Sequence, residues 1–269
     1  MEPLVRPLAG ADLSLVRAIF TDVDGTLTTG NVLRAQTLQR LWELRAAGVR
    51  VVLVSGRPAG WGECWARQLP IDGAIVENGG LYFVAEGPWQ MRKVYAQPEA
   101  ERVEGRRRLQ RAIRQVLKAT PGARLSSDTV YTEVDMAIDW NEEARLPVET
   151  ARGLERTMRA KGFQAVRSSV HINCWAGDFD KRSTSFAFLR DEWKLGPKKA
   201  RAQVLYVGDS FNDAPMFKAF PLSVGVANVR PLLGELAHPP AFITRAEEGV
   251  GFEEVARAVL RAVRGEQKR

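Results

Sequence analysis

The chain has 269 residues, of which 45% are hydrophobic and 26% are charged, and its net charge is +7. This length allows one large core or two modest ones, and the composition is that of a soluble protein. The apolar runs are far shorter than a bilayer span, so we expect no membrane segment. The first residues, Met1-Glu2-Pro3, lack the basic and apolar regions of a signal peptide. We therefore expect a cytoplasmic protein.

The positive net charge raises the question of nucleic-acid binding. The densest basic run, Arg106-Arg107-Arg108, has no interleaved aromatic residues and matches no nucleic-acid motif. We therefore expect no nucleic-acid partner. Salt-sensitive binding to a duplex would instead support nucleic-acid binding. A basic surface also attracts phosphorylated metabolites, which is the partner class that agrees best with the polar clusters in this chain.

Buried strands alternate with amphipathic helices in the first third of the chain. The run at 49–54 is almost wholly apolar, as in a parallel strand that is covered on both faces. Gly48, just before it, is a typical helix-ending residue. The predicted order is a strand at 17–21, a helix at 35–47, the strand at 49–54, a helix that contains Trp61 and Trp65, and a strand at 73–76. This alternation predicts a doubly wound parallel sheet.

The pattern changes after residues 81–83 and changes back near residue 178. The middle segment alternates polar and apolar residues, which is typical of half-exposed strands. It predicts a helix at 98–119, a strand at 129–139, a helix at 147–161 and an alternating segment at 164–175. The final segment predicts a helix at 181–193, strands at 204–207, 222–226 and 241–244, and a closing helix at 251–263. We expect an α/β fold in which a Rossmann-like parallel sheet carries a separate α+β layer.

Polar residues follow four of the predicted strands. Because the carboxyl ends of parallel strands meet at one edge of a sheet, these residues are expected to converge. Any one cluster could be a turn or a helix cap, but four in equivalent positions indicate one site. Asp22 and Asp24 are so close in the chain that their charges repel each other unless a cation lies between them. The four clusters are Asp22 with Asp24, Ser55, Glu77 with Asn78, and Asp209 with Asn212 and Asp213.

These clusters resemble the motifs of the haloacid dehalogenase-like (HAD) phosphohydrolases, and the resemblance covers nearly the whole chain. The first motif is Asp22-Val23-Asp24-Gly25-Thr26, and the second is Ser55-Gly56-Arg57. Lys181 stands in the place of the third, and Gly208-Asp209-Ser210-Phe211-Asn212-Asp213 in that of the fourth. The two acidic motifs, in this order and each after a buried strand, are the most specific part of the resemblance.

The spacing of the motifs resembles subclass IIB, which includes Cof-type and other sugar-phosphate phosphatases and also the eukaryotic phosphomannomutases. About 125 residues separate Ser55 from Lys181, far more than one or two strand–helix units require. The resemblance implies a catalytic core made of residues 1–84 and 179–269. It places an inserted α/β cap domain at 85–178, between the second and third motifs.

The resemblance implies roles that agree with the residue types. Asp22 would attack phosphorus and form an aspartyl-phosphate, and Asp24 would be the general acid and then the general base. Ser55 would donate a hydrogen bond to the phosphoryl group, and Lys181 would add positive charge. Mg²⁺ suits a site of carboxylate and carbonyl oxygens. Its expected ligands are Asp22, the backbone carbonyl of Asp24, and Asp209, with Asp213 orienting them.

Further residues are candidates for substrate binding, each with a simpler structural alternative. Thr26 could contact phosphate or support its turn. Arg57 could contact the substrate or pair with a surface carboxylate, and Asn78 could support the site or form a turn. On one predicted strand, His171 and Asn173 could contact the leaving group or form an exposed face. The full set is Thr26, Gly56, Arg57, Asn78, His171, Asn173 and Asn212.

Together these features predict a Mg²⁺-dependent phosphatase for a small phosphorylated metabolite, with a sugar phosphate as the expected substrate. A phosphomutase of the phosphomannomutase type would use the same residues but return the phosphoryl group to the sugar. A non-catalytic binding protein on the same fold is the other alternative. Metal-dependent phosphate release would exclude the binding protein, and isomerisation without net phosphate release would favour the mutase.

Overall fold

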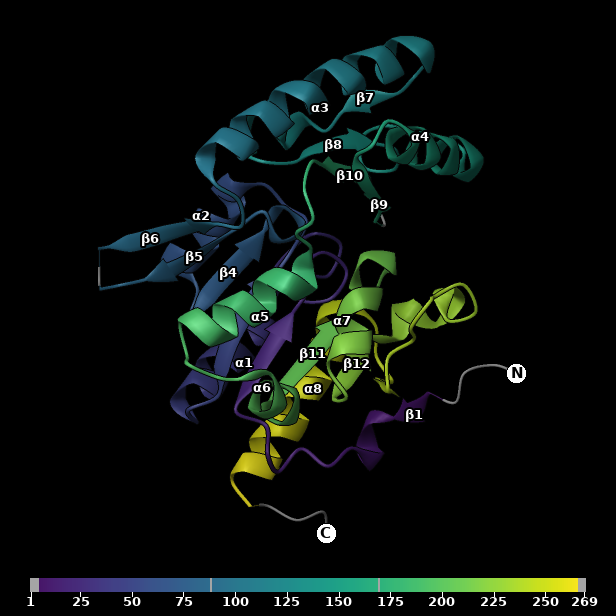
Figure 1. Cartoon of the computed structure of the whole chain (residues 1–269). Helices are drawn as coiled ribbons and strands as arrows, with labels where there is room; N and C mark the ends of the chain where they lie inside the picture. The colour runs from purple at the N-terminus through teal and green to yellow at the C-terminus, as the bar shows by residue number, and fades with distance from the viewer. Residues whose placement is uncertain (1–4, 88, 169, 266–269) are drawn as a thin grey trace.

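The computed structural model describes residues 5–87, 89–168 and 170–265. Within these residues the strands form two sheets, one of nine strands and one of four (Figure 1). Figure 1 shows the smaller sheet and two long helices, α3 (Glu99–Ala119) and α4 (Val148–Ala160), above the larger sheet. The predicted α/β fold with a separate inserted layer is confirmed. No helix in the described residues is long and apolar enough to cross a membrane, and the cytoplasmic location stays a prediction.

The larger sheet is parallel through its centre. β2 (Ala18–Thr21) lies between β3 (Arg50–Val54) and β11 (Val204–Gly208), and both neighbours run parallel to it. The sheet continues in parallel through β12 (Ser223–Gly225), β13 (Phe242–Ile243) and β1 (Arg6–Pro7) on one side. On the other side it continues through the parallel β4 (Gly73–Val76) and the antiparallel hairpin of β5 (Leu81–Ala85) and β6 (Met91–Tyr95).

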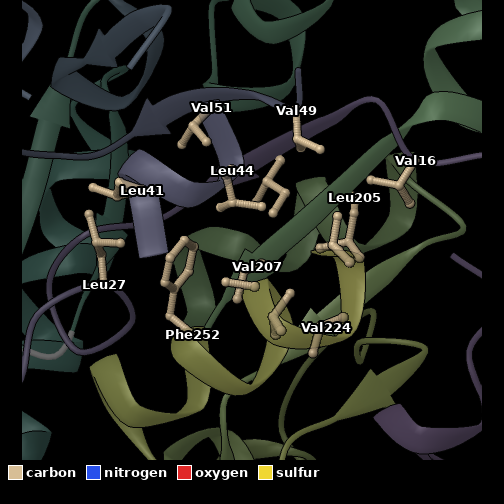
Figure 2. Packing of buried hydrophobic residues seen from close by; sticks show 14 of the residues in the cluster. Val16, Leu27, Leu41, Leu44, Val49, Val51, Leu205, Val207, Val224 and Phe252 are labelled. Carbon is tan, nitrogen blue, oxygen red and sulfur yellow. The ribbon is translucent and has the colours of Figure 1, made fainter. Parts of the chain in front are cut away.

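Alternate residues of the central strands enter two different cores. Val51, Leu205 and Val207 face one side, where α1 (Ala35–Ala46) and α8 (Glu248–Val263) cover the sheet (Figure 2). Val52 and Tyr206 face the other side, against residues of α5 (Lys181–Asp191), α6 (Pro197–Gln203) and α7 (Ala214–Ala219). Burial on both faces explains why these strands read as continuous apolar runs rather than as alternating ones.

The smaller sheet is antiparallel, with one face covered by helices. Its order is β7 (Arg124–Leu125), β8 (Met136–Asp139), β10 (His171–Trp175) and β9 (Gln164–Arg167). Ile172 and Cys174 of β10 are buried with apolar residues of α3 and α4. Because side chains alternate along a strand, His171, Asn173 and Trp175 lie on the opposite face. Trp175 packs there with residues of β4 and α2 (Ala59–Gln68), so this face is turned toward the larger sheet.

Two strand predictions in this layer differ from the structure. The predicted strand at 129–139 is wrong in its first part, because Ser127–Tyr131 is a 3-10 helix and only Met136–Asp139 is a strand. The backbone N–H groups of residues 133, 134 and 135 donate to the buried carboxylate of Glu77, 2.6 to 2.8 Å away, instead of to a neighbouring strand. The segment at 164–175 contains two strands, β9 and β10, that pair with each other.

The division into a core at 1–84 and 179–269 and a cap at 85–178 stays a proposal. β6 pairs with β5 and continues the larger sheet as far as Tyr95. We therefore propose to count the chain up to Tyr95 with the core and to use the name cap for the layer built on the smaller sheet, α3 and α4.

Candidate active site

The predicted strand ends converge at one edge of the larger sheet. β3 and β11 flank β2, with Thr21 in register with Leu53 and with Val207. Asp22, Ser55 and Asp209 directly follow these three strands, and all three side chains are buried. Parallel pairing therefore brings together polar residues that lie far apart in the chain.

Three carboxylates form a cluster that could hold a metal ion. Asp22, Asp209 and Asp213 each offer one oxygen, and these oxygens lie within 4.8 Å of one another. Thr26 Oγ1 donates to Asp209 Oδ1 over 3.1 Å, and Asn228 Nδ2 donates to Asp209 Oδ2 over 2.9 Å. Thr26 thus holds a carboxylate of the cluster, in keeping with a supporting role for its turn.

The cluster carries more negative charge than its neighbours neutralise. Burial raises the pKa of Asp22 to about 7, although Lys181 Nζ lies 2.8 Å from its Oδ1. Burial, and then the charges of Asp22 and Asp213, raise the pKa of Asp209 well above its usual range. A divalent cation with a preference for oxygen ligands would relieve this repulsion. The residues present therefore fit a metal ion of this kind.

Lys181 and Asp213 form a buried network beside the cluster. Lys181 Nζ donates to Asp213 Oδ1 over 2.9 Å as well as to Asp22. Burial lowers the pKa of Lys181, but the attraction of Asp213 and Asp22 outweighs this effect and raises it overall. Tyr206 Oη also donates to Asp213 Oδ1, and the backbone N–H groups of residues 209 and 210 donate to Oδ2. Because both its oxygens accept from the protein, Asp213 suits an orienting role better than direct metal binding.

Asp24 is bound by Arg57. Arg57 Nε lies 2.8 Å from Asp24 Oδ2, and Arg57 Nη2 lies 3.1 Å from Asp24 Oδ1. The same guanidinium donates to Asp128 over 3.1 Å and to Glu142 over 2.8 Å, and both of these acids belong to the cap. The other oxygen of Glu142 lies 2.7 Å from His171 Nε2. Arg57 is itself buried and pairs with three half-buried acids rather than with a carboxylate at the open surface.

A small cavity of about 20 Å³ lies at the junction of core and cap. Asp22, Asp24 and Ser55 line it from the core, and His171 and Asn173 line it from the cap. Asn173 Oδ1 is buried there and has no hydrogen-bond partner among the described residues. An orphaned buried acceptor is costly, and its position beside the carboxylates leaves it available to a ligand.

The turns after β3 and β4 bring the core into contact with the cap. Ser55 Oγ accepts a hydrogen bond from Arg57 N over 3.0 Å, which leaves the hydroxyl hydrogen for another acceptor. A Cβ on Gly56 would lie 3.1 Å from Asn173 Nδ2, so the missing side chain allows this close approach. Asn78 Nδ2 donates to Asp135 Oδ2 over 3.1 Å. Asn78 thus contacts the cap rather than the carboxylate cluster.

Asn212 lies between the small cavity and a larger cleft of about 520 Å³, because it lines both. Its Oδ1 accepts from Ser210 Oγ over 2.6 Å. The sequence analysis missed Asn228, whose Nδ2 joins Asp209 to the backbone carbonyl of Gly25. Asn228 comes three residues after β12, as the other site residues follow their strands, and that position is the signal that could have identified it.

Comparison with known proteins bears on the predicted family resemblance. A family model described as haloacid dehalogenase-like hydrolase matches residues 19–100, which include Asp22 and Ser55. A phosphoglycolate phosphatase of Haloarcula marismortui is 28% identical over 242 residues, which cover 88% of this chain and 94% of the relative. One of Methanopyrus kandleri is 24% identical, with 91% and 97% covered. The predicted resemblance to the haloacid dehalogenase-like hydrolases is confirmed by these matches. The predicted enzyme class, a phosphoric monoester hydrolase, is confirmed by these relatives.

Solved structures share the fold of this hydrolase. Thermoplasma acidophilum 0175 aligns with a TM-score of 0.69 at 19% identity and covers 91% of this chain and 98% of its own. The sucrose-phosphatase of Synechocystis, solved with sucrose and phosphate, has a TM-score of 0.63 at 16% identity, with 91% and 98% covered. A HAD subclass IIB sugar phosphatase has a TM-score of 0.61 at 16% identity, with 90% and 98% covered. These likenesses show a shared fold and agree with the predicted core and inserted layer.

Proposed function

We propose that this hydrolase is a Mg²⁺-dependent phosphatase that acts on a small phosphorylated metabolite through an aspartyl-phosphate at Asp22. The position of Asp22 carries the proposal. Lys181 holds its Oδ1, no described residue donates to its Oδ2, and the side chain lines the cavity between core and cap. A fixed carboxylate with one available oxygen is the arrangement that an in-line nucleophile requires.

Two steps complete the proposed reaction. An oxygen of Asp22 bonds to phosphorus and the ester P–O bond breaks, while Asp24 gives a proton to the departing alcohol. Asp24 then takes a proton from water, the water oxygen bonds to phosphorus, and the bond to Asp22 breaks to release inorganic phosphate. Ser55 and Lys181 would stabilise the negative charge on the phosphoryl oxygens throughout.

The residues proposed to hold Mg²⁺ are Asp22, Asp209 and the backbone carbonyl of Asp24. Asp213 would orient Lys181 and the turn that carries Asp209, since its carboxylate accepts hydrogen bonds from both. When bound, the ion supplies positive charge that offsets the repulsion between the carboxylates and the phosphate. The raised pKa values of Asp22 and Asp209 support a cation at this position.

Two substrate classes are in keeping with the relatives. A sugar phosphate agrees with the sugar phosphatases that share the fold. A small phosphorylated acid agrees with the name phosphoglycolate phosphatase that the curated relatives carry. Those names also favour hydrolysis over the phosphomutase alternative. Net release of inorganic phosphate from a single monophosphate, without a bisphosphate activator, would decide for hydrolysis.

The variant Asp22→Asn tests the nucleophile. We expect it to abolish metal-dependent turnover of an aryl phosphate while its thermal denaturation stays cooperative. Asp191→Asn is the matched control, because Asp191 is exposed and, among the described residues, its carboxylate forms an ion pair only with its neighbour Arg190. Retained turnover in Asp22→Asn would contradict the aspartyl-phosphate mechanism.

A further inference from the structure

Arg167, the last residue of β9, carries a guanidinium that lies over two aromatic rings and has no anionic partner among the described residues. Its Cζ is 5.6 Å from the ring centroid of Trp140 in the cap and 4.9 Å from that of Phe211 in the core. Its Nε is buried without a hydrogen-bond partner, and no described residue forms an ion pair with the group. A buried donor without a partner costs free energy, so this guanidinium is placed for a ligand.

The cleft of about 520 Å³ is the space that Arg167 faces. Phe211, Asn212 and Lys181 line the same cleft. Asn212 also lines the small cavity that contains Asp22 and Asp24. The cleft therefore meets the small cavity at Asn212, and it has room for a leaving group that extends past this residue.

The other guanidinium groups at this junction are already engaged. Arg57 makes four hydrogen bonds to the carboxylates of Asp24, Asp128 and Glu142. Arg159, which lines the same cleft as Arg167, donates to the carbonyl of Ala165 and to Glu155. Among the described residues of the cleft, Arg167 is thus the guanidinium whose donors are available to an anion.

We propose that Arg167 determines specificity by binding a carboxylate on the leaving group of the phosphate ester. The inference rests on the proposed function and names its substrate class: a short phosphorylated acid rather than a neutral sugar phosphate. A guanidinium presents its donors in a planar fork that matches a carboxylate with two parallel hydrogen bonds. The rings of Trp140 and Phe211 lie within cation–π distance of the guanidinium and hold it at the cleft.

The test compares two esters that differ only in the carboxylate. Phosphoglycolate and 2-hydroxyethyl phosphate have the same length, but the second ends in a neutral hydroxyl group. We expect the wild-type protein with Mg²⁺ to prefer phosphoglycolate in kcat/KM, and Arg167→Met to reduce that preference by about 10- to 100-fold. Methionine keeps most of the side-chain length beside the two rings, and equal denaturation midpoints show that the fold is kept.

Arg159→Met is the matched control, because it removes a positive charge from the same cleft at a guanidinium that already has partners. It should leave the preference between the two esters unchanged. An equal loss on both esters in Arg167→Met, or an equal effect of Arg159→Met, would overturn the inference and leave the phosphatase intact. Failure of the wild-type protein to release phosphate from either ester would instead overturn the proposed function and the inference with it.

Discussion

Asp24 and Arg57 form a two-point ion pair, with Arg57 Nε 2.8 Å from Asp24 Oδ2 and Arg57 Nη2 3.1 Å from Asp24 Oδ1. The remaining donors of the guanidinium contact Asp128 and Glu142 of the cap. The proposed proton-transfer residue and the cap are therefore connected through one side chain. A rearrangement of the cap would change the partners of Arg57 and, with them, the position of Asp24.

Arg57→Met is expected to impair proton transfer to the leaving group. An alkyl phosphate requires that proton, whereas an aryl phosphate such as p-nitrophenyl phosphate leaves readily without it. Because general acid catalysis contributes about 100- to 10,000-fold, loss of the residue that positions Asp24 should lower the first-turnover rate on an alkyl ester by about 100-fold. The first-turnover rate on the aryl ester should fall much less, as measured by rapid mixing.

The control for this experiment is Arg67→Met, because Arg67 forms an exposed pair with Glu63 four residues away. That variant should leave both rates unchanged. If Arg57→Met slows the two esters by the same factor, Arg57 has a structural role only and does not position Asp24.

Asp209→Asn should raise the thermal stability of the metal-free protein and weaken its response to Mg²⁺. Without metal, the variant loses one charge of a buried carboxylate cluster, so its midpoint of thermal denaturation should rise. A ligand that binds only the folded state raises the midpoint with its concentration. Addition of Mg²⁺ should therefore stabilise the wild-type protein and have little effect on the variant. An equal Mg²⁺-dependent rise in both proteins would show that the ion binds elsewhere.

Glu142 should stabilise the folded protein, and this stabilisation should be lost at acid pH. The hydrogen bond from His171, and then the contacts with Arg57, lower its pKa from 4.5 to about 2. A carboxyl group whose pKa is lowered on folding stabilises above its unfolded pKa and loses this effect as the pH falls toward its folded pKa. Urea denaturation should show that Glu142→Gln is less stable than wild type near pH 6, with the difference shrinking between about pH 4.5 and pH 2. A constant difference over this range would contradict the assignment.

Asp135 is expected to affect stability in the opposite direction to Glu142, because its contribution should be lost as the pH rises. Burial, and then the charge of Glu77, raise its pKa well above the usual range. A carboxyl group whose pKa is raised on folding favours the folded state most when it is protonated, and this contribution is lost as the pH rises through its folded pKa. Asp135→Asn cannot ionise, so its stability relative to wild type should increase as the pH rises above about 4. Parallel stability curves for the two proteins would show that Asp135 does not titrate in this range.

The residue pattern by itself determined the core of the fold and the edge of the sheet at which the candidate site lies. Strands buried on both faces lack alternation, and parallel strands place their carboxyl ends together. For this reason Asp22, Ser55 and Asp209 could be assigned to one site before any contact was known. The long interval between Ser55 and Lys181 likewise predicted an inserted layer, because loops of that length without secondary structure are uncommon in compact domains.

Tertiary packing alone decided which partner each charged side chain has. Arg57 and Asp24 are 33 residues apart, and Arg57 and Glu142 are 85 apart, so no local pattern relates them. The segment at 129–134 alternates like a strand. The backbone N–H groups of residues 133 to 135, however, donate to the buried carboxylate of Glu77 rather than to a neighbouring strand. Arg159 and Arg167 are alike in sequence terms, and only the folded chain shows that Arg159 is bonded while Arg167 is free for a ligand. The pattern of apolar residues sets strands and their ends, whereas ion pairing and orphaned donors depend on contacts between distant segments.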